Sequence, residues 1–411
     1  MPTDTARQTL HARILVLAGA VSGMGGAPAM IALLVATALW SVRDLVTRRL
    51  PMHLAQPDRL LVIMASLFVA VYLLFAALNS SGFQGDLADL AVSISPLALY
   101  LLVFPVILRL RTPQCDSLDR LVLGAGICAI LPLPLALYQV FVQGDRATGV
   151  TGNALPFALI CAVFSVLSLF NVLSESRWRP YLGLAGFFSG LTCLFLSGSI
   201  GLLPVVIPAS LIFVIVYRQA FLRWYNRISL ALAAIGLLAM GLAASQWSER
   251  LVNMVLFMLR PDGSKRFTTF NLRLQMWDAA VVLIRERPWL GHGMQNRVQL
   301  LHDRTGLDFV QFHNGFLNAW VDSGLAGVLA TVLLLLTPLI MAIRAPRDAA
   351  YGRRLFIASY VTAIFLVGGL TYVLFLDPVY DSVFLWLAIA IALSVPAVKT
   401  STAPYQSQTG T

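Results

Sequence analysis

Residues 266–280 read RFTTFNLRLQMWDAA, residues 285–293 read RERPWLGHG, and residues 312–327 read FHNGFLNAWVDSGLAG. Charged, aromatic and histidine side chains are concentrated in this segment, whereas long apolar runs dominate the chain on both sides of it. This contrast predicts a polar segment that a membrane-embedded scaffold holds at one face of a bilayer.

The composition is that of a membrane protein. Of the 411 residues, 58% are hydrophobic and 12% are charged, whereas a soluble protein has about a quarter charged residues. Lipid offers no hydrogen-bond partner to the backbone, so long apolar runs are expected to be helices. These runs lie at about residues 13–23, 28–41, 60–78, 90–108, 120–142, 154–173, 181–197, 200–217, 228–246, 325–343, 355–375 and 383–398. They predict an all-α, polytopic membrane protein with about 12 transmembrane helices and one large outer loop that contains short helices.

The first two runs are short, and the sequence SGMGGAP separates them at residues 22–28. Neither run alone crosses about 30 Å of hydrocarbon at a rise of about 1.5 Å per residue. The two runs form either a hairpin or one broken helix, so the sequence predicts about eleven or twelve spans.

Loop charge predicts the orientation of the chain. With twelve spans, the arginine-rich loops all fall on one side together with both termini: residues 42–59, 109–120, 174–180, 218–227 and 344–354. The alternate loops 79–89 and 376–382 are acidic or neutral. Cytoplasmic loops are enriched in Lys and Arg, so the arginine-rich side is predicted to be the cytoplasm. If the first two runs form one span, only the N-terminus changes to the other side of the membrane, and the rest of the predicted topology is unchanged.

These predictions divide the chain into N-terminal transmembrane helices (1–246), an outer loop (247–324), C-terminal transmembrane helices (325–398) and a polar, disordered cytoplasmic tail (399–411). The N-terminus lacks a cleavable signal-peptide pattern, because its first apolar run leads into a second one. The four cysteines show no metal or redox spacing. Cytoplasmic loop charge explains most of the net charge of +10 without nucleic acid.

The outer loop is nevertheless basic. It contains Arg250, Arg260, Lys265, Arg266, Arg273, Arg285, Arg287, Arg297 and Arg304. These cations serve either solubility and contact with anionic headgroups, or the binding of an anion at the membrane surface. A smaller outer loop at residues 144–153 places Arg146 among glycines, which either let the backbone approach a ligand or form an ordinary turn.

One helix is predicted in the first part of the outer loop. Asn271 is a candidate N-cap for a helix that runs to about Glu286 and stops before Pro288. Arg273 and Trp277 are four residues apart and therefore share a face of this helix. Arg273 is then either a membrane-surface anchor that stacks on an aromatic ring or a ligand for an anion.

Two histidines follow. His292 lies between Gly291 and Gly293 in a tight bend, where it is either a ligand or a turn residue, and the flanking glycines favour the turn. His313 and Asn314 precede a long helical run, and Asn314 is a candidate N-cap. Free N–H groups at a helix start favour anions. His313 is either interfacial filler or a group that transfers a proton near an anionic substrate.

Taken in order, these residues resemble the O-antigen ligase and O-antigen polymerase superfamily. The pattern is R-x3-W-x2-A at Arg273, Trp277 and Ala280, P-x2-G-x-G at Pro288, Gly291 and Gly293, H-N-x2-L at His313, Asn314 and Leu317, and G-x2-G at Gly324 and Gly327. It covers roughly residues 266–327, and residues 144–153 also look like a family loop that precedes a span. The remainder of the chain matches only in topology.

Members of this superfamily take a glycan from undecaprenyl diphosphate at the periplasmic face of the bacterial inner membrane. Ligases pass it to lipid A–core in lipopolysaccharide biosynthesis, and polymerases pass it to another lipid-linked repeat unit. The resemblance therefore implies an inverting glycosyltransferase that needs no metal or other cofactor. It also implies a periplasmic outer loop, cytoplasmic termini, and membrane lipids rather than nucleic acid as partners.

The resemblance also implies roles for individual residues. The family's loop arginine and histidine correspond to Arg273 and His313, which are the candidate catalytic pair. Arginine forks suit phosphate oxygens, so Arg273 is the first candidate for holding the diphosphate, and His313 is the candidate for activating the acceptor hydroxyl. Arg266, Arg146 and Asn314 are further candidates for diphosphate binding, and Trp277, Gly291 and Gly293 are expected to position the loop.

One departure from the family pattern affects the choice of activity. Many ligases carry an arginine in a Ser-Gly-Ser-Arg-like turn, where this chain reads Ser197-Gly198-Ser199-Ile200. The missing cation weakens the ligase interpretation relative to a polymerase, unless Arg146 or Arg266 replaces it. A lipid-linked oligosaccharide flippase or other transporter is a further alternative, but it would be expected to show internal repeats and charges inside its spans, which are not evident.

Overall fold

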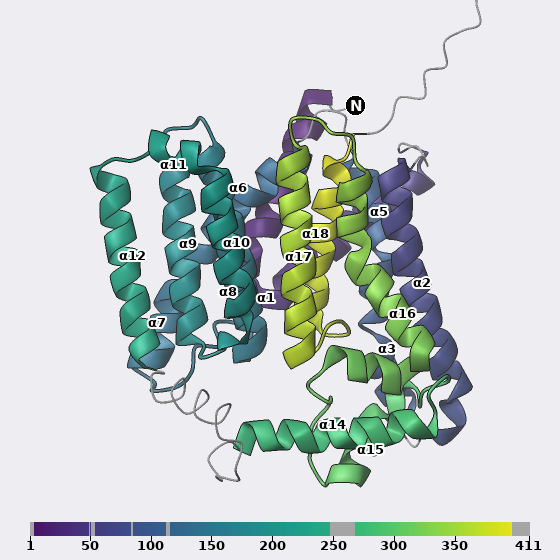
Figure 1. Ribbon diagram of the computed structural model, residues 1–411. Coiled ribbons are helices and arrows are strands. Elements are labelled where there is room, and N and C mark those ends of the chain that lie inside the picture. The colour runs from purple at the N-terminus through teal and green to yellow at the C-terminus, as the bar shows by residue number, and fades with distance from the viewer. Residues whose placement is uncertain are drawn as a thin grey trace, which may run out of the picture.

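The computed structural model describes residues 4–48, 50, 54–83, 85–111, 116–246 and 268–396, and the regular structure in these ranges is entirely helical. The predicted all-α class is confirmed. Most helices run side by side in a bundle, whereas α14 and α15 lie across one end of it (Figure 1). Residues 247–267 of the predicted outer loop and the tail at 399–411 lie outside the described residues.

The longer elements are α1 (Asp4–Val46), α2 (Gln56–Leu78), α6 (Ser117–Ile130), α8 (Ala154–Ser168), α9 (Arg179–Leu196), α10 (Leu203–Val216), α12 (Arg227–Ser245), α14 (Thr268–Glu286), α16 (Gly315–Arg344), α17 (Tyr351–Thr371) and α18 (Pro378–Ser394). The shorter elements, in which η marks a 3-10 helix, are η1 (Ser80–Gly82), α3 (Leu87–Ile94), α4 (Leu97–Leu101), α5 (Val103–Leu110), α7 (Leu133–Phe141), η2 (Leu169–Leu173), η3 (Ile200–Leu202), α11 (Arg218–Arg223), η4 (Met294–Asn296) and α15 (Arg297–Thr305).

Within the described ranges, eight helical stretches are long and apolar enough to cross a membrane, and α3 with the helix up to Leu110 makes a ninth if that pair, bent by 49°, is one span. The predicted number of about 12 is therefore not confirmed. Each predicted run contains a helix, but α10 has 14 residues and α18 has 17. At about 1.5 Å per residue, neither reaches about 30 Å.

The first two predicted runs belong to a single element, α1, which Gly26 interrupts with φ +56° and ψ −150°. The bend is sharp, because Ser22 Oγ lies 2.9 Å from Met30 Sδ, eight residues further on. A straight helix would separate these positions by about 12 Å along its axis. The chain therefore breaks at the predicted place.

Small residues let α1 approach α6 closely. A Cβ atom added to Gly19 would lie 2.7 Å from the Leu121 carbonyl oxygen, and one added to Gly124 would lie 2.2 Å from the Val16 carbonyl oxygen. Without a hydrophobic driving force in lipid, membrane helices associate through such close backbone contacts. The two helices thus form a tightly packed part of the scaffold.

Ion pairs join the helix ends that lie away from α14. Because α16 begins beside α14 and runs the length of the bundle, the start of α17 lies at the far end (Figure 1). The arginines there come from the loops predicted to be basic. The pairs are Arg109–Asp44, Arg111–Asp58, Arg179–Asp119, Arg353–Asp116 and Arg354–Asp348. Part of the predicted cytoplasmic charge is therefore used within the protein.

A break in α16 receives the turn that follows α14. Ser323 and Gly324 have non-helical backbone angles, with φ +60° at Gly324. Three backbone hydrogen bonds join the turn to the break: Leu325 N–H to Pro288 O at 3.1 Å, His292 N–H to Val321 O at 2.7 Å, and Gly293 N–H to Asp322 O at 2.9 Å. The turn with Gly291 and Gly293 therefore packs on the break at Gly324. We call this contact between the polar segment and the bundle the joint.

This joint leads to a first prediction. A Cβ atom at Gly324 would lie 2.1 Å from the Trp289 carbonyl oxygen, and the positive φ disfavours any side chain. We expect Gly324→Ala to destabilise the protein by more than about 2 kcal/mol, from overpacking and backbone strain together. Thermal melting in detergent measures the effect. It is monitored by the loss of the monodisperse peak in size-exclusion chromatography.

The matched control is Gly241→Ala in α12, where an added Cβ atom meets nothing within 4 Å. Alanine is a better helix former than glycine, so this variant should melt at or slightly above the wild-type temperature. Equal melting of the two variants would show that the joint does not contribute to stability.

Candidate functional site

The polar segment folds into a small unit with its own core. α14, α15 and the start of α16 pack around Met276, Ala279, Ala280, Leu283, Leu301, Phe312 and Val321. Asn271 lies inside α14, which already includes Thr268, so the prediction that Asn271 caps this helix is wrong. Asparagine is only weakly unfavourable inside a helix, and a suitable cap residue does not by itself decide where a helix begins. The predicted end at Glu286 agrees with the structure.

The peptide group of Phe312 is held from both sides. Its carbonyl oxygen accepts a hydrogen bond from Trp277 Nε1 at 2.9 Å, and its N–H donates to Asn318 Oδ1 at 3.0 Å. Phe312 itself is fully buried. Trp277 and Asn318 therefore fix the backbone immediately before His313.

The backbone immediately after His313 is fixed by a helix cap. Asn314 Oδ1 accepts hydrogen bonds from the N–H groups of Phe316 and Leu317 at 3.0 and 3.2 Å, so the predicted N-cap is confirmed. Between these anchors, His313 has φ +49°, which few residues other than glycine adopt. Strained backbone of this kind persists where its surroundings determine it, and it is frequent at functional sites.

Aromatic rings flank the His313 side chain. The Phe309 ring centroid lies 5.5 Å from that of His313, and the Tyr372 centroid lies 5.6 Å from it. The His313 Nδ1 atom is buried without a hydrogen-bond partner in the described chain. Burial, and secondarily the positive charge of Arg273, lowers the pKa of His313 to about 4. The imidazole is therefore neutral at pH 7.

Arg273 lies on α14, one turn before Trp277, and is half-buried. Its charge acts on His313, so the structure brings together the two residues that the sequence nominated as a pair. Arg266, the neighbouring candidate for diphosphate binding, lies outside the described residues.

Arg146 reaches the turn in which the sequence lacks an arginine. Its Nε donates to the Ser197 carbonyl oxygen at 2.8 Å, and its Nη2 donates to Ser199 Oγ at 2.9 Å. Gly198, between these serines, has φ +64°. A guanidinium from a loop about fifty residues earlier is thus held on the Ser-Gly-Ser turn.

Two residues that the sequence did not indicate join the Arg146 loop to His313. Asn153 ends that loop, and its Nδ2 donates to the Tyr372 hydroxyl oxygen at 3.2 Å. Tyr372 directly follows α17 and contacts His313. Residue type alone gave no signal for either one, because a tyrosine near a span end is usually an interfacial anchor.

The turn after α14 has a structural role. Gly291 and Gly293 have φ +62° and +84°, and a Cβ atom on Gly291 would lie 2.6 Å from the Gly324 nitrogen. His292 is buried, and its Nε2 lies 2.9 Å from the Leu283 carbonyl oxygen. His292 is therefore a turn residue with a partner inside the protein, as the flanking glycines favoured.

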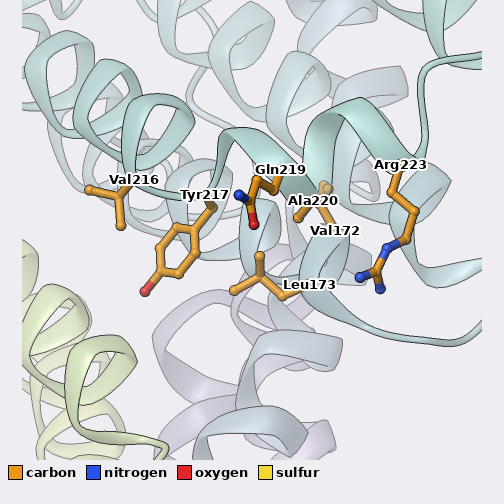
Figure 2. A pocket seen from close by; sticks show the side chains of 7 residues that line it. All are labelled: Val172, Leu173, Val216, Tyr217, Gln219, Ala220 and Arg223. Atoms are coloured by element: carbon orange, nitrogen blue, oxygen red, sulfur yellow. The ribbon is translucent and has the colours of Figure 1, made fainter.

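One cavity of about 250 Å³ lies elsewhere, under α11 and at the opposite end of the bundle from α14 (Figures 1 and 2). It is lined by Val172, Leu173, Val216, Tyr217, Gln219, Ala220 and Arg223. None of the candidate residues lines it, so we do not assign the site to it. The described part of the chain contains no group of three or more His, Cys, Asp or Glu side chains placed to hold a metal ion.

Comparison with known proteins finds a family match that includes this part of the chain. Residues 162–332 match the family model of O-antigen ligase, a family of membrane glycosyltransferases. The matched range contains both Arg273 and His313. The match covers less than half of the chain, and it supports the resemblance to the O-antigen ligase superfamily found in the sequence.

A relative in Haemophilus influenzae, an uncharacterized protein, is 27% identical over 233 residues, which is 51% of this chain and 56% of that protein. The chain thus spans little more than half the length of this relative.

Proposed function

We propose that this chain is an O-antigen ligase-like glycosyltransferase that moves a glycan from undecaprenyl diphosphate to lipid A–core at the periplasmic face of the inner membrane. The observation that carries the proposal is the strained, ring-flanked His313, on which the charge of Arg273 acts, inside the family-matched range. The bundle exposes large apolar side chains that suit contact with lipid, and the polar unit of α14, α15 and early α16 supplies the chemistry.

The proposed reaction is a single displacement at the anomeric carbon, which inverts its configuration. The acceptor hydroxyl forms the new carbon–oxygen bond and passes its proton to His313 Nε2, while the bond to the diphosphate oxygen breaks. The leaving diphosphate is already a stable anion, so it needs charge stabilisation more than a proton. Arg273 supplies that stabilisation, with Arg146, Arg266 and the Asn314-capped helix start as further contacts.

The orientation of the chain is part of the same proposal. The layer of arginine–carboxylate pairs lies at the far end of the bundle from α14, and the positive-inside rule assigns that end, with both termini, to the cytoplasm. The polar unit then faces the periplasm. We keep the division into residues 1–246, 247–324, 325–398 and 399–411 as part of this proposal.

A polymerase that joins lipid-linked repeat units is the alternative activity, because it uses the same donor and chemistry. Ile200, in place of the arginine of many ligases, favours it. Arg146 on the Ser197–Ser199 turn favours the ligase, since it supplies a cation to that turn. A flippase or other transporter is a third interpretation, and it gives no reason for a neutral histidine beside an arginine.

The test is reconstitution of the purified protein in liposomes with an undecaprenyl-diphosphate-linked glycan and either lipid A–core or a second lipid-linked glycan. A new glycosidic bond to lipid A–core supports the ligase, and lengthened lipid-linked chains support the polymerase. Movement of the glycan across the bilayer without any new bond would refute both and identify a transporter.

The neutral state of His313 predicts the pH dependence. Burial and Arg273 lower its pKa from 6.5 to about 4. A general base acts in its deprotonated form, and kcat/KM reports the free enzyme. We therefore expect kcat/KM to stay level from pH 7 to about 5 and to fall by half near pH 4. A pH profile of initial rates measures this, and a half-loss at pH 6.5 would mean that His313 is neither buried nor influenced by Arg273 as described.

A further inference from the structure

Tyr372 is the shared member of two sets of contacts. On one side its ring lies 5.6 Å from the His313 ring, centroid to centroid. On the other side its hydroxyl oxygen accepts the hydrogen bond from Asn153 Nδ2 at 3.2 Å. Tyr372 therefore touches both the histidine loop and the loop that carries Arg146.

The direction of the Asn153 bond is fixed by a helix cap. Asn153 Oδ1 accepts from the Leu155 N–H at 3.0 Å and so caps α8. This leaves the Nδ2 group to donate to Tyr372. The amide orientation is thus set by the fold and does not depend on Tyr372.

The segment that carries Tyr372 is rigid. The following residues fold back into the bundle, where Leu374 is fully buried. Gly315, at the start of α16, lies against this segment so closely that an added Cβ atom would be 2.4 Å from the Leu374 nitrogen. The Leu376 N–H donates to the buried Asp381 Oδ1 at 3.0 Å. Packing against Gly315 and the bond to Asp381 therefore hold the segment that follows Tyr372 in place.

The Asn153 end is anchored as well. The next residue, Ala154, accepts a hydrogen bond through its carbonyl oxygen from Ser199 Oγ at 3.4 Å, and Ser199 Oγ also accepts from Arg146. A continuous set of contacts then runs from Arg146 through Ser199, Asn153 and Tyr372 to His313.

We propose that Tyr372 and Asn153 are positioning residues that set the distance and orientation between His313 and the Arg146 loop. This inference rests on the proposed function, in which His313 activates the acceptor and Arg146 helps to hold the donor diphosphate. Reacting groups must be aligned to within a fraction of an ångström, and a misplacement of about 1 Å can cost about 100-fold in rate. A rigid link between the two halves of the site meets that requirement.

Two variants test the link. Tyr372→Phe keeps the ring beside His313 but removes the hydroxyl, and we expect kcat/KM to fall by about 10-fold, as for a lost hydrogen bond. Asn153→Asp keeps the α8 cap, because aspartate caps a helix as well as asparagine does. It removes the Nδ2 donor and places a carboxylate on the Tyr372 hydroxyl, close to His313.

The pH profile separates positioning from general stability. The groups that face His313 are Phe309, Tyr372 and the charge of Arg273. An added carboxylate favours the protonated imidazole, so the acid limb of kcat/KM should move to higher pH in Asn153→Asp. An acid limb that stays at its wild-type position would mean that Asn153 does not lie close to His313 as described.

The matched control is Tyr360→Phe, which removes a buried hydroxyl that donates to the Ala162 carbonyl oxygen within the bundle. It should lower the melting temperature without changing the pH profile or kcat/KM. If the wild type forms no glycosidic bond, the proposed function fails. If the wild type is active and Tyr372→Phe and Asn153→Asp match its kcat/KM and pH profile, the positioning role alone fails.

Discussion

Replacing His313 by alanine is expected to reduce glycan transfer by at least about 100-fold, while the protein still inserts and purifies normally. A positioned general base contributes about 10²–10⁴ to a rate, and His313 is the proposed base. The side chain is only half-buried, so its removal should cost little stability. Initial rates in proteoliposomes with a lipid-linked donor measure the effect.

The other histidines of the polar unit provide matched controls. His302 is exposed on α15, and its Nδ1 lies 3.0 Å from Asp308 Oδ1. The His302→Ala variant should therefore transfer glycan at the wild-type rate. His292 is buried in the turn that docks on α16, so His292→Ala should melt at a lower temperature. Wild-type rates in His313→Ala would remove the proposed base from the mechanism.

Local patterns in the sequence were sufficient for the features that depend on neighbouring residues. Apolar periodicity identified the helices, and charge alternation assigned the arginine-rich loops that supply the ion pairs at one end of the bundle. The Asn314 cap was predictable because an N-cap needs only a short polar side chain before a helical run. The break near Gly26 was predictable because glycine permits the backbone angles that a bend requires.

Features that depend on distant contacts were not predictable. Tyr372 and Asn153 are more than two hundred residues apart and meet only because α8 and α17 lie in one bundle. The number of spans could not be fixed from the sequence, because an apolar run does not reveal whether its helix is long enough or straight enough to cross the membrane. The positive φ of His313 depends on bonds from Trp277 and Asn318 to the preceding peptide, which no local pattern encodes.

The Ser-Gly-Ser turn shows how a distant residue changes an interpretation made from the local sequence. With Ile200 following Ser199, the local sequence argued that a cation is missing. In the structure, the Arg146 guanidinium bonds to Ser197 and Ser199 of that turn. The position of charge in space, rather than in the chain, therefore decides how strongly this departure weakens the ligase assignment.

Arg273 should be the second residue whose loss nearly abolishes transfer. Removing one preorganised donor to a developing anion typically costs about 10²–10³ in rate, so Arg273→Ala is expected to fall in that range. Arg273→Lys should remain strongly impaired, because lysine offers a point charge where arginine offers a planar fork. The control is Arg285→Ala, which removes an exposed arginine near the end of the same helix and should leave the rate unchanged.

The same variant makes a prediction about His313 that a structural defect alone would not produce. The positive charge of Arg273 helps to lower the pKa of His313, so removing that charge should raise this pKa. Protonation of the base would then begin at a higher pH, and the acid limb of residual kcat/KM in Arg273→Ala should move upward. Arg273→Lys keeps the charge, so its acid limb should stay near the wild-type position although its rate is reduced. A common acid limb in all three proteins would mean that the guanidinium and the imidazole do not interact, and the proposed catalytic pair would be abandoned.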